Sequence, residues 1–231
     1  TPEIQRFTTS FNHMAEELGS SEMLRTDFVN NFSHEFKSPI VSIRGFAKML
    51  KYNDLSKEEY NEYLDIIISE SERLSQLATN VLNLSKVENQ TFLSSPKEYN
   101  LTEQIRLAIA MMAQKWSFKK ISFDFDCEEI FFYGNEELMN QVWINLIDNA
   151  IKFSPANDNI NMSLKCQNDT ILFTIHDSGP GMGEEVQKHI FDKFYQGNSS
   201  HTGQGNGLGL TIAYKIVKLH SGSIQVSSSQ T

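Results

Sequence analysis

The chain has 231 residues, 39% of them hydrophobic and 21% charged, which is enough for two compact cores. Its formal charge of −9 and its lack of a Lys/Arg-rich run argue against a nucleic-acid partner, because phosphate backbones attract clustered cations. Cys127 and Cys166 are far apart and have no metal-ligand spacing, so the sequence predicts neither a disulfide framework nor a zinc site and fits a reducing compartment.

The ends of the chain and its hydropathy indicate a soluble piece of a longer protein. No apolar run approaches the roughly 18 residues that a membrane span needs, and no signal-peptide pattern is present. The chain begins at Thr1 without a methionine and within a helical pattern, and it ends in SSSQT without an evident terminal element. We therefore expect further sequence in the parent protein.

The first part of the chain, from about residue 8 to residue 88, is helical in character. Its first half has apolar residues every three or four positions, as an amphipathic helix requires: Phe28, Phe32, Phe36, Ile40, Ile43, Ala47 and Leu50. Pro39 lies inside this stripe and removes an amide donor, which predicts a kink after His34. His34 falls about 200° from its neighbours in the stripe, so we expect an exposed imidazole. A lone exposed histidine is usually only a solvated side chain.

A second helix is predicted after a turn at residues 52–54. Ser56 and Glu59 have the spacing of a capping box, which marks its start. Its apolar stripe is Tyr60, Leu64, Ile67, Leu74, Leu77, Val81 and Leu84. A single helical hairpin leaves much of both stripes uncovered, so we infer that two hairpins pair as a homodimer in an all-α four-helix bundle. The alternative is that both helices pack on the rest of their own chain.

The pattern changes to α/β after the stretch Leu93-Ser94-Ser95-Pro96, which we interpret as a linker at a domain boundary. The predicted elements are a helix at about 102–118, strands at 121–125 and 131–133, a helix at 136–153, strands at 160–166 and 171–176, a helix at 208–219 and a short strand at 223–226. Gln167-Asn168-Asp169 has the composition of a hairpin turn, so the two strands beside it are predicted to be antiparallel and the sheet to be mixed.

The helix predicted at 136–153 has a polar face that suits a nucleotide. Asn145, Asn149 and Lys152 are spaced four and three apart, so they share this face. Carboxamide oxygens are hard ligands that suit Mg²⁺, and an ammonium group binds phosphate oxygens. A solvated helix face would explain the same three residues equally well.

Two glycine-rich turns add to this polar face. Residues 177–183, DSGPGMG, follow a strand, and Asp177 can accept a hydrogen bond from an exocyclic amine such as that of adenine. Turn chemistry explains these glycines but not the acid. Residues 203–210, GQGNGLGL, run into a helix, whose amides and dipole attract an anion. This run is neither a P-loop nor a dinucleotide-binding turn. Three stretches that each suit a nucleotide, in a fixed order, are stronger evidence for a nucleotide-binding site than any one of them alone.

Together these stretches resemble the sensor histidine kinases. SHEFKSP is similar to the family's H box, NLIDNAIKFS to its N box, DSGPGM to its G1 box, FDKFYQ to its F box and GNGLGL to its G2 box, in family order. Residues 11–18, FNHMAEEL, resemble the end of a HAMP signalling module. The resemblance implies a HAMP-like helix end at 1–20, a dimerisation and phosphotransfer domain at 21–93, and an ATP-binding domain at 97–231. That last domain would be an α/β sandwich of the Bergerat (GHKL) type, with helices on one face of a mixed sheet and its last strand missing.

The resemblance also implies roles for single residues. His34 is the expected phosphoacceptor, and Glu35 the acid that hydrogen-bonds its ring and takes up a proton. Ser38 stands where the family usually has Thr or Asn, and its hydroxyl can orient water. Asn149 is the expected Mg²⁺ ligand, and 184–206 the expected lid. The ATP-binding residues implied are Asn145, Asn149, Lys152, Phe153, Asp177, Gly179, Gly181, Met182, Lys193, Phe194, Tyr195, Gly205, Gly207, Leu208, Gly209 and Leu210. Gln196 stands where many members have Arg, which removes one positive contact.

The expected function is ATP- and Mg²⁺-dependent autophosphorylation of His34, followed by transfer to an aspartate of a response-regulator receiver domain. Hydrolysing relatives have a glutamate where this chain has Asn145, and an amide cannot deprotonate water, so transfer to a side chain is favoured. The parent is expected to be a homodimer anchored in a bacterial plasma membrane. The alternatives are a dimeric scaffold that binds nucleotide without phosphotransfer, and a GHKL-type serine kinase or ATPase.

Overall fold

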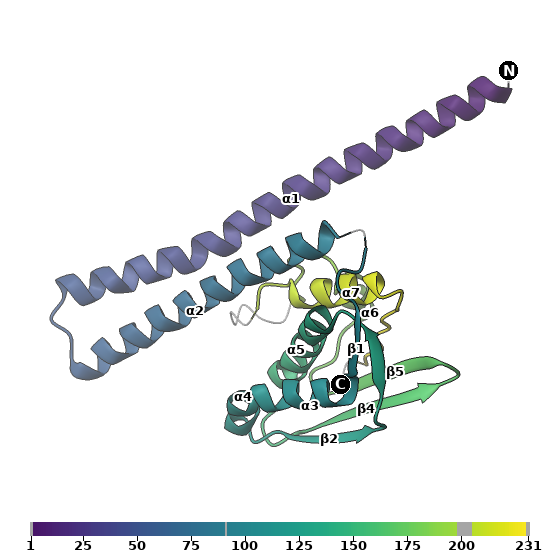
Figure 1. Ribbon diagram of the computed structural model, residues 1–231. Coiled ribbons are helices and arrows are strands. Elements are labelled where there is room, and N and C mark those ends of the chain that lie inside the picture. The colour runs from purple at the N-terminus through teal and green to yellow at the C-terminus, as the bar shows by residue number, and fades with distance from the viewer. Residues whose placement is uncertain (1, 91, 198–204, 230–231) are drawn as a thin grey trace. The chain divides into compact units, whose positions relative to one another are not determined.

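The computed structural model describes residues 2–90, 92–197 and 205–229, and side chains at residue 26 and from residue 28 onwards in those ranges (Figure 1). The chain forms two compact units, Thr1–Ala78 and Thr79–Thr231. The side chains of the expected HAMP-like segment, 1–20, lie outside the described residues. The domain limits at 93 and 97 remain predictions.

The first unit is the helical hairpin that the sequence predicts. It consists of α1 (Pro2–Tyr52) and the first part of α2 (Lys57–Glu88). The rings of Phe32 and Phe36 lie 4.4 Å apart along α1, and Phe46 of α1 lies 5.2 Å from Tyr63 of α2. The helix α1 continues through Pro39, which is buried.

The start of α2 confirms the predicted capping box. The Ser56 amide donates to Glu59 Oε2 at 2.9 Å, and the Glu59 amide donates to Ser56 Oγ at 3.2 Å. These reciprocal bonds satisfy two amide donors that the first turn of a helix leaves without partners. The bonds from Ser56 hold the pKa of Glu59 below its ordinary value.

The second unit is an α/β fold with two sheets. Its strands are β1 (Lys97–Asn100), β2 (Ser122–Cys127), β3 (Phe131–Gly134), β4 (Asn159–Gln167) and β5 (Thr170–His176). The three-stranded sheet has the order β2-β4-β5, with β2 parallel and β5 antiparallel to β4, which confirms the mixed sheet. β1 pairs with β3 in a separate antiparallel sheet, and β1 was not anticipated from the sequence. Asn168 and Asp169 both have positive φ, as a two-residue hairpin turn requires.

The helices of this unit are α3 (Leu101–Met111), α4 (Ala113–Phe118), α5 (Glu136–Phe153), α6 (Glu184–His189) and α7 (Gly209–Leu219). α3 and α5 lie over one face of the three-stranded sheet, and α7 packs on α5 (Figure 1). The central strand β4 has buried Ile160, Met162 and Leu164 at alternate positions, as expected for a strand covered on one face. The core therefore forms between this face and the helices.

Two predicted elements are wrong. The single helix at 102–118 is divided at Met112, where the backbone leaves the helical region. The carbonyl of Ile109 accepts from the Met112 amide at 3.1 Å and from the Trp116 indole at 3.0 Å, so a side chain adds to the backbone bond at the break. The predicted strand at 223–226 is irregular backbone.

Candidate functional site

The polar face of α5 meets the glycine turn that precedes α7. Asn145 is half-buried, and its Nδ2 donates to the Gln141 carbonyl at 2.8 Å. Its Oδ1 therefore faces Gly209, where an added Cβ would lie only 2.8 Å from this oxygen. Only glycine lets the two helices approach so closely here. The predicted N box and G2 box are thus adjacent.

Lys152 brings the cation of the N box to the same turn. An added Cβ at Gly205 would lie 2.7 Å from Lys152 Nζ, which also lies 4.5 Å from the centre of the Phe153 ring. Burial lowers the pKa of Lys152, and the nearby Asp148 carboxylate offsets part of this effect. A half-buried ammonium at a glycine turn is a binding group for an anion such as phosphate.

The G1 turn packs on the C-terminal end of α5. The Gly179 amide donates to Asp177 Oδ1 at 3.0 Å, which fixes the exposed Asp177 carboxylate. An added Cβ at Gly179 would lie 3.2 Å from the Phe153 carbonyl, so the turn and the helix end are in close contact. Gly181 has a φ of 71°, a conformation that favours glycine. The Met182 amide donates to Ser228 Oγ at 2.9 Å.

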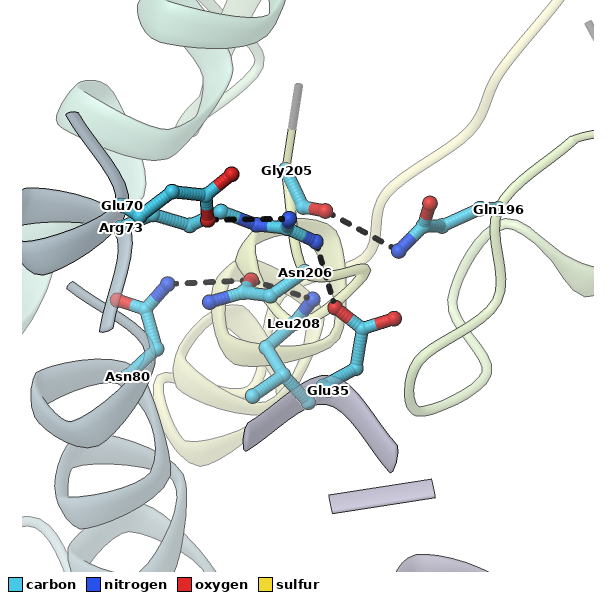
Figure 2. Close-up of polar contacts among 8 residues, drawn as sticks. All are labelled: Glu35, Glu70, Arg73, Asn80, Gln196, Gly205, Asn206 and Leu208. Carbon is cyan, nitrogen blue, oxygen red and sulfur yellow. Dashed lines mark hydrogen bonds and ion pairs between the residues drawn. The ribbon is translucent and has the colours of Figure 1, made fainter. Parts of the chain in front are cut away.

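The F box and the G2 box are in direct backbone contact. The Phe194 amide donates to the Gly207 carbonyl at 3.0 Å, and an added Cβ at Gly207 would lie 2.6 Å from the Phe194 carbonyl carbon. Gln196 Nε2 donates to the Gly205 carbonyl at 3.1 Å (Figure 2), so this amide contacts the glycine turn where many relatives have an arginine. The Tyr195 ring lies beside His189. Of the predicted lid, residues 198–204 lie outside the described residues.

Two predicted ligand residues have other contacts in the structure. The Leu208 side chain is fully buried in the core, so its backbone amide, which donates to Asn206 Oδ1 at 3.3 Å, is the group that belongs to the turn. Leu210 is half-buried. Lys193 Nζ forms an ion pair with Glu88 Oε1 at 2.7 Å. The prediction that Lys193 contacts nucleotide remains a prediction.

Sequence reasoning missed the contribution of the last turns of α2 to the second unit. Asn80 Nδ2 donates to Asn206 Oδ1 at 3.3 Å (Figure 2), and Glu88 pairs with Lys193 of the F box. Both α2 residues lie four positions from the buried Leu84. Polar residues beside an apolar stripe are the sequence feature that could have indicated hydrogen-bond and ion-pair partners for this part of α2.

In the first unit, His34 is exposed, as predicted, and so is Ser38. Glu35 Oε2 accepts a hydrogen bond from Arg73 Nη2 of α2 at 3.1 Å, and Arg73 Nη1 lies 3.7 Å from Glu70 Oε2 (Figure 2). The sequence reasoning did not select Arg73. The sequence feature that could have indicated Arg73 is Glu70, which lies in the apolar stripe between Ile67 and Leu74. A partly buried acid at such a position needs a cation nearby.

The second unit thus gathers acid, amide and ammonium groups around its glycine turns. Comparison with known families gives the class: residues 134–231 match the "Histidine kinase-, DNA gyrase B-, and HSP90-like ATPase" family, and residues 24–90 match the "His Kinase A (phospho-acceptor) domain". The fold is therefore a phosphoacceptor hairpin followed by an ATP-binding domain of this type. Because both domains match in this order, the chain belongs to the sensor histidine kinase family.

Curated relatives support this assignment. The chain is 34% identical over 229 residues to the heme sensor protein HssS of Staphylococcus epidermidis, a match that covers 98% of this chain and 49% of that protein. It is 36% identical over 220 residues to HssS of Staphylococcus saprophyticus, with 94% of this chain and 47% of that protein covered. The chain thus spans about half the length of the curated relatives it matches.

Solved structures agree with the fold. Histidine kinase ThkA in complex with response regulator protein TrrA matches with a TM-score of 0.70 and 27% identity, over 85% of this chain and 55% of that chain. Histidine kinase AdeS of Acinetobacter baumannii matches with a TM-score of 0.69 and 24% identity, over 85% of this chain and 92% of that chain, which supports the fold alone. In the part of the chain that the structure describes, no helix has the length and apolarity to cross a membrane.

Proposed function

We propose that this chain transfers the γ-phosphoryl group of ATP to His34 and then to an aspartate of a response-regulator receiver domain. The observation that carries the proposal is the convergence of Asn145 and Lys152 on Gly209 and Gly205, which assembles a phosphate-binding turn. The exposed His34 provides an acceptor that a nucleotide on another unit can reach.

The reaction proceeds in two phosphoryl transfers, first from ATP to His34 and then from His34 to the receiver aspartate. The His34 ring nitrogen that carries the lone pair attacks the γ-phosphorus, an N–P bond forms, and the bond to the β,γ-bridging oxygen breaks with its electron pair leaving on ADP. The proton on the other ring nitrogen passes to the Glu35 carboxylate. A receiver aspartate then attacks the phosphorus, the N–P bond breaks with its electrons returning to the ring, and Glu35 returns the proton.

Other groups bind and orient the nucleotide. Lys152 and the amides of the G2 turn receive the phosphates, and the fixed Asp177 carboxylate accepts from the adenine amine. Phe194 and Tyr195 cover the nucleotide from the lid side, and Ser38 orients water for dephosphorylation of the receiver. The remaining predicted nucleotide contacts are Phe153, Gly179, Gly181, Met182, Lys193, Leu208 and Leu210.

The residues present fit a magnesium ion that is shared with the substrate. Among the described residues, no three His, Cys, Asp or Glu side chains gather as metal ligands. Mg²⁺ commonly takes only one or two protein oxygens and fills its other positions with water and phosphate. We assign Asn149, half-buried on the same face as Asn145, as the protein ligand. When bound, the ion neutralises phosphate charge.

The larger assembly is also part of the proposal. Exposed apolar residues of the first unit, among them Val29, Ile40, Val41, Met49, Tyr60 and Ile68, support a homodimeric four-helix bundle. The likeness to HssS supports a longer parent sensor protein anchored in a bacterial plasma membrane, and the likeness to ThkA in its complex with TrrA supports a receiver-domain partner.

Incubation with γ-labelled ATP and Mg²⁺ tests the proposal. We expect acid-labile, alkali-stable label on the wild-type chain and none on His34→Gln, while both bind ATP equally. Nucleotide binding without label would favour a dimeric scaffold, and acid-stable label or rapid release of phosphate would indicate a serine kinase or ATPase. Either result would overturn the assignment of His34.

A further inference from the structure

Arg73 lies between two carboxylates that come from different helices. Its Nη2 donates to Glu35 Oε2 of α1 at 3.1 Å, and its Nη1 lies 3.7 Å from Glu70 Oε2 one turn earlier in α2 (Figure 2). The side chains of Arg73 and Glu35 are only 28% and 25% exposed. A guanidinium group is planar and presents its donors in a fixed fork, so it holds the direction of a carboxylate as well as its charge.

The carboxylate that Arg73 holds belongs to the residue next to the exposed His34. A carboxylate has two oxygens, so the bond from Arg73 to Oε2 still permits Oε1 to accept from the N–H of an imidazole. A histidine ring that donates one N–H to a fixed acceptor keeps its tautomer and orientation, and the other nitrogen then retains its lone pair.

We propose that Arg73 is a positioning residue for the phosphorylation of His34 and that it acts through Glu35. By fixing one carboxylate oxygen, it directs the other toward the imidazole N–H, so that the attacking nitrogen is held unprotonated and aligned. This inference rests on the proposed function, because it assumes that His34 is the phosphoacceptor. Arg73 itself touches neither the nucleotide nor the reacting atoms.

The competing explanation is that Arg73 only ties α1 to α2. Loss of a structural tie through Glu35 would lower stability and reduce the active fraction of the protein, but it would leave the rate per folded molecule unchanged in Arg73→Met. A positioning residue that acts through Glu35 has no further effect once the Glu35 carboxylate is gone. A double-mutant cycle on rates per folded molecule, with the folded fraction of each variant measured separately, therefore separates the two explanations.

The experiment measures initial autophosphorylation rates of the full 231-residue chain at saturating MgATP, together with the KM for ATP. For Glu35→Gln we expect a rate loss of about 100-fold, the lower end of the range for a lost general base. For Arg73→Met we expect a loss of about 10-fold from misorientation. The double variant should match Glu35→Gln within about two-fold, with the KM for ATP unchanged in all three.

Three controls keep the test decisive. Arg44→Met removes an exposed arginine from α1 of the same unit, and we expect its rate to equal that of the wild type. Arg73→Lys retains the charge without the fork, so it should recover part of the rate. Circular dichroism measures folding of each variant, and if Arg73→Met is unfolded, Arg73→Lys takes its place in the cycle.

The outcomes are distinguishable. A double variant that loses about 10-fold more rate than Glu35→Gln would show additive effects and overturn the positioning role. A raised KM for ATP in Arg73→Met would overturn it as well. If instead the wild-type chain carries no acid-labile label, the proposed function fails first, and the inference falls with it.

Discussion

In the second unit, the candidate binding groups are held by their neighbours: Asn145 is pressed against Gly209, Lys152 against Gly205, and Phe194 against Gly207. In the first unit, His34 stands exposed on a single helix, and its neighbour Glu35 has a defined partner across the hairpin. The difference shows two separate requirements. A turn that binds a ligand needs close backbone contact, whereas a side chain that reacts with a ligand held by another unit must be exposed to solvent.

The largest expected difference between the two units is the response to a glycine-to-alanine substitution, which adds one methyl group to each. Gly209→Ala puts a Cβ 2.8 Å from Asn145 Oδ1, and Asn145 cannot withdraw without weakening its bond to the Gln141 carbonyl. We expect a loss of about 1–3 kcal/mol of stability and about a 10-fold rise in the KM for ATP.

Gly45→Ala is the matched control in α1. Nothing lies within 4 Å of an added Cβ there, so alanine should stabilise the helix by about 1 kcal/mol without changing the KM. Thermal unfolding and ATP titration measure both variants. Equal behaviour of the two alanines would show that the second unit is not tightly packed at α7.

Lys152→Met should change the stability of the second unit and its affinity for ATP in opposite directions. The pKa of Lys152 is lowered mainly by burial, so the unfolded chain binds more protons there than the folded chain between the lowered pKa and the ordinary value of 10.5. The charged amine therefore costs stability at neutral pH, and this cost is relieved as pH rises through that window.

Without nucleotide, Lys152→Met should unfold at a higher temperature than the wild type at pH 7, and the gap should narrow above the lowered pKa. Its ATP affinity should fall about 10-fold, because the phosphates lose a cation. Calorimetry and nucleotide titration give the two values. A variant that is both less stable and unchanged in ATP affinity would contradict the assignment of Lys152 as an anion-binding group.

His220 should make the stability of the second unit sensitive to acid. Its Nε2 accepts from the Asn135 amide at 3.1 Å, which leaves Nδ1–H to donate to the Ile216 carbonyl at 2.8 Å. Burial lowers the pKa of His220 below 6.5, and the bond to Ile216 offsets part of this effect. Protonation of Nε2 would break the bond to Asn135, which caps α5.

The unfolded chain therefore binds more protons than the folded chain as pH falls from 6.5 toward the lowered pKa, and stability is lost in that window. We expect a fall of a few degrees in Tm between pH 7 and pH 5. His220→Gln should remove most of this dependence, whereas the matched change His34→Gln at an exposed ring should leave it. Equal pH profiles for wild type and His220→Gln would refute the role of His220.

Local patterns predicted much of this molecule from the sequence. The Ser56 capping box, the turn at Asn168 and the exposure of His34 all follow from residues within one or two turns of each other, so spacing alone is sufficient. The glycine motifs predicted a phosphate-binding turn, which stays a prediction, and the structure places Gly205 against Lys152.

Contacts between distant residues were not predictable in the same way. Glu35 and Arg73 are 38 positions apart, and Asn80 and Asn206 are 126 apart, so no periodicity relates them. The break at Met112 was missed because the apolar pattern continues through it and does not indicate the hydrogen bond from the Trp116 indole to the Ile109 carbonyl across the break. These features depend on tertiary geometry rather than on local preference.

The smallest expected effect belongs to the hairpin and tests whether the two units respond separately. Ser56→Ala removes the side chain that accepts from the Glu59 amide at 3.2 Å, and loss of such a cap costs about 1 kcal/mol. We expect a slightly lower unfolding temperature for the first unit and an unchanged KM for ATP, because the proposed nucleotide-binding groups lie in the second unit. Ser71→Ala is the matched control, since the Ser71 hydroxyl donates back to the Ile67 carbonyl within α2. A rise in KM for Ser56→Ala as large as that for Gly209→Ala would mean that the end of the hairpin helps to shape the nucleotide site, and the contrast between the two units would then be wrong.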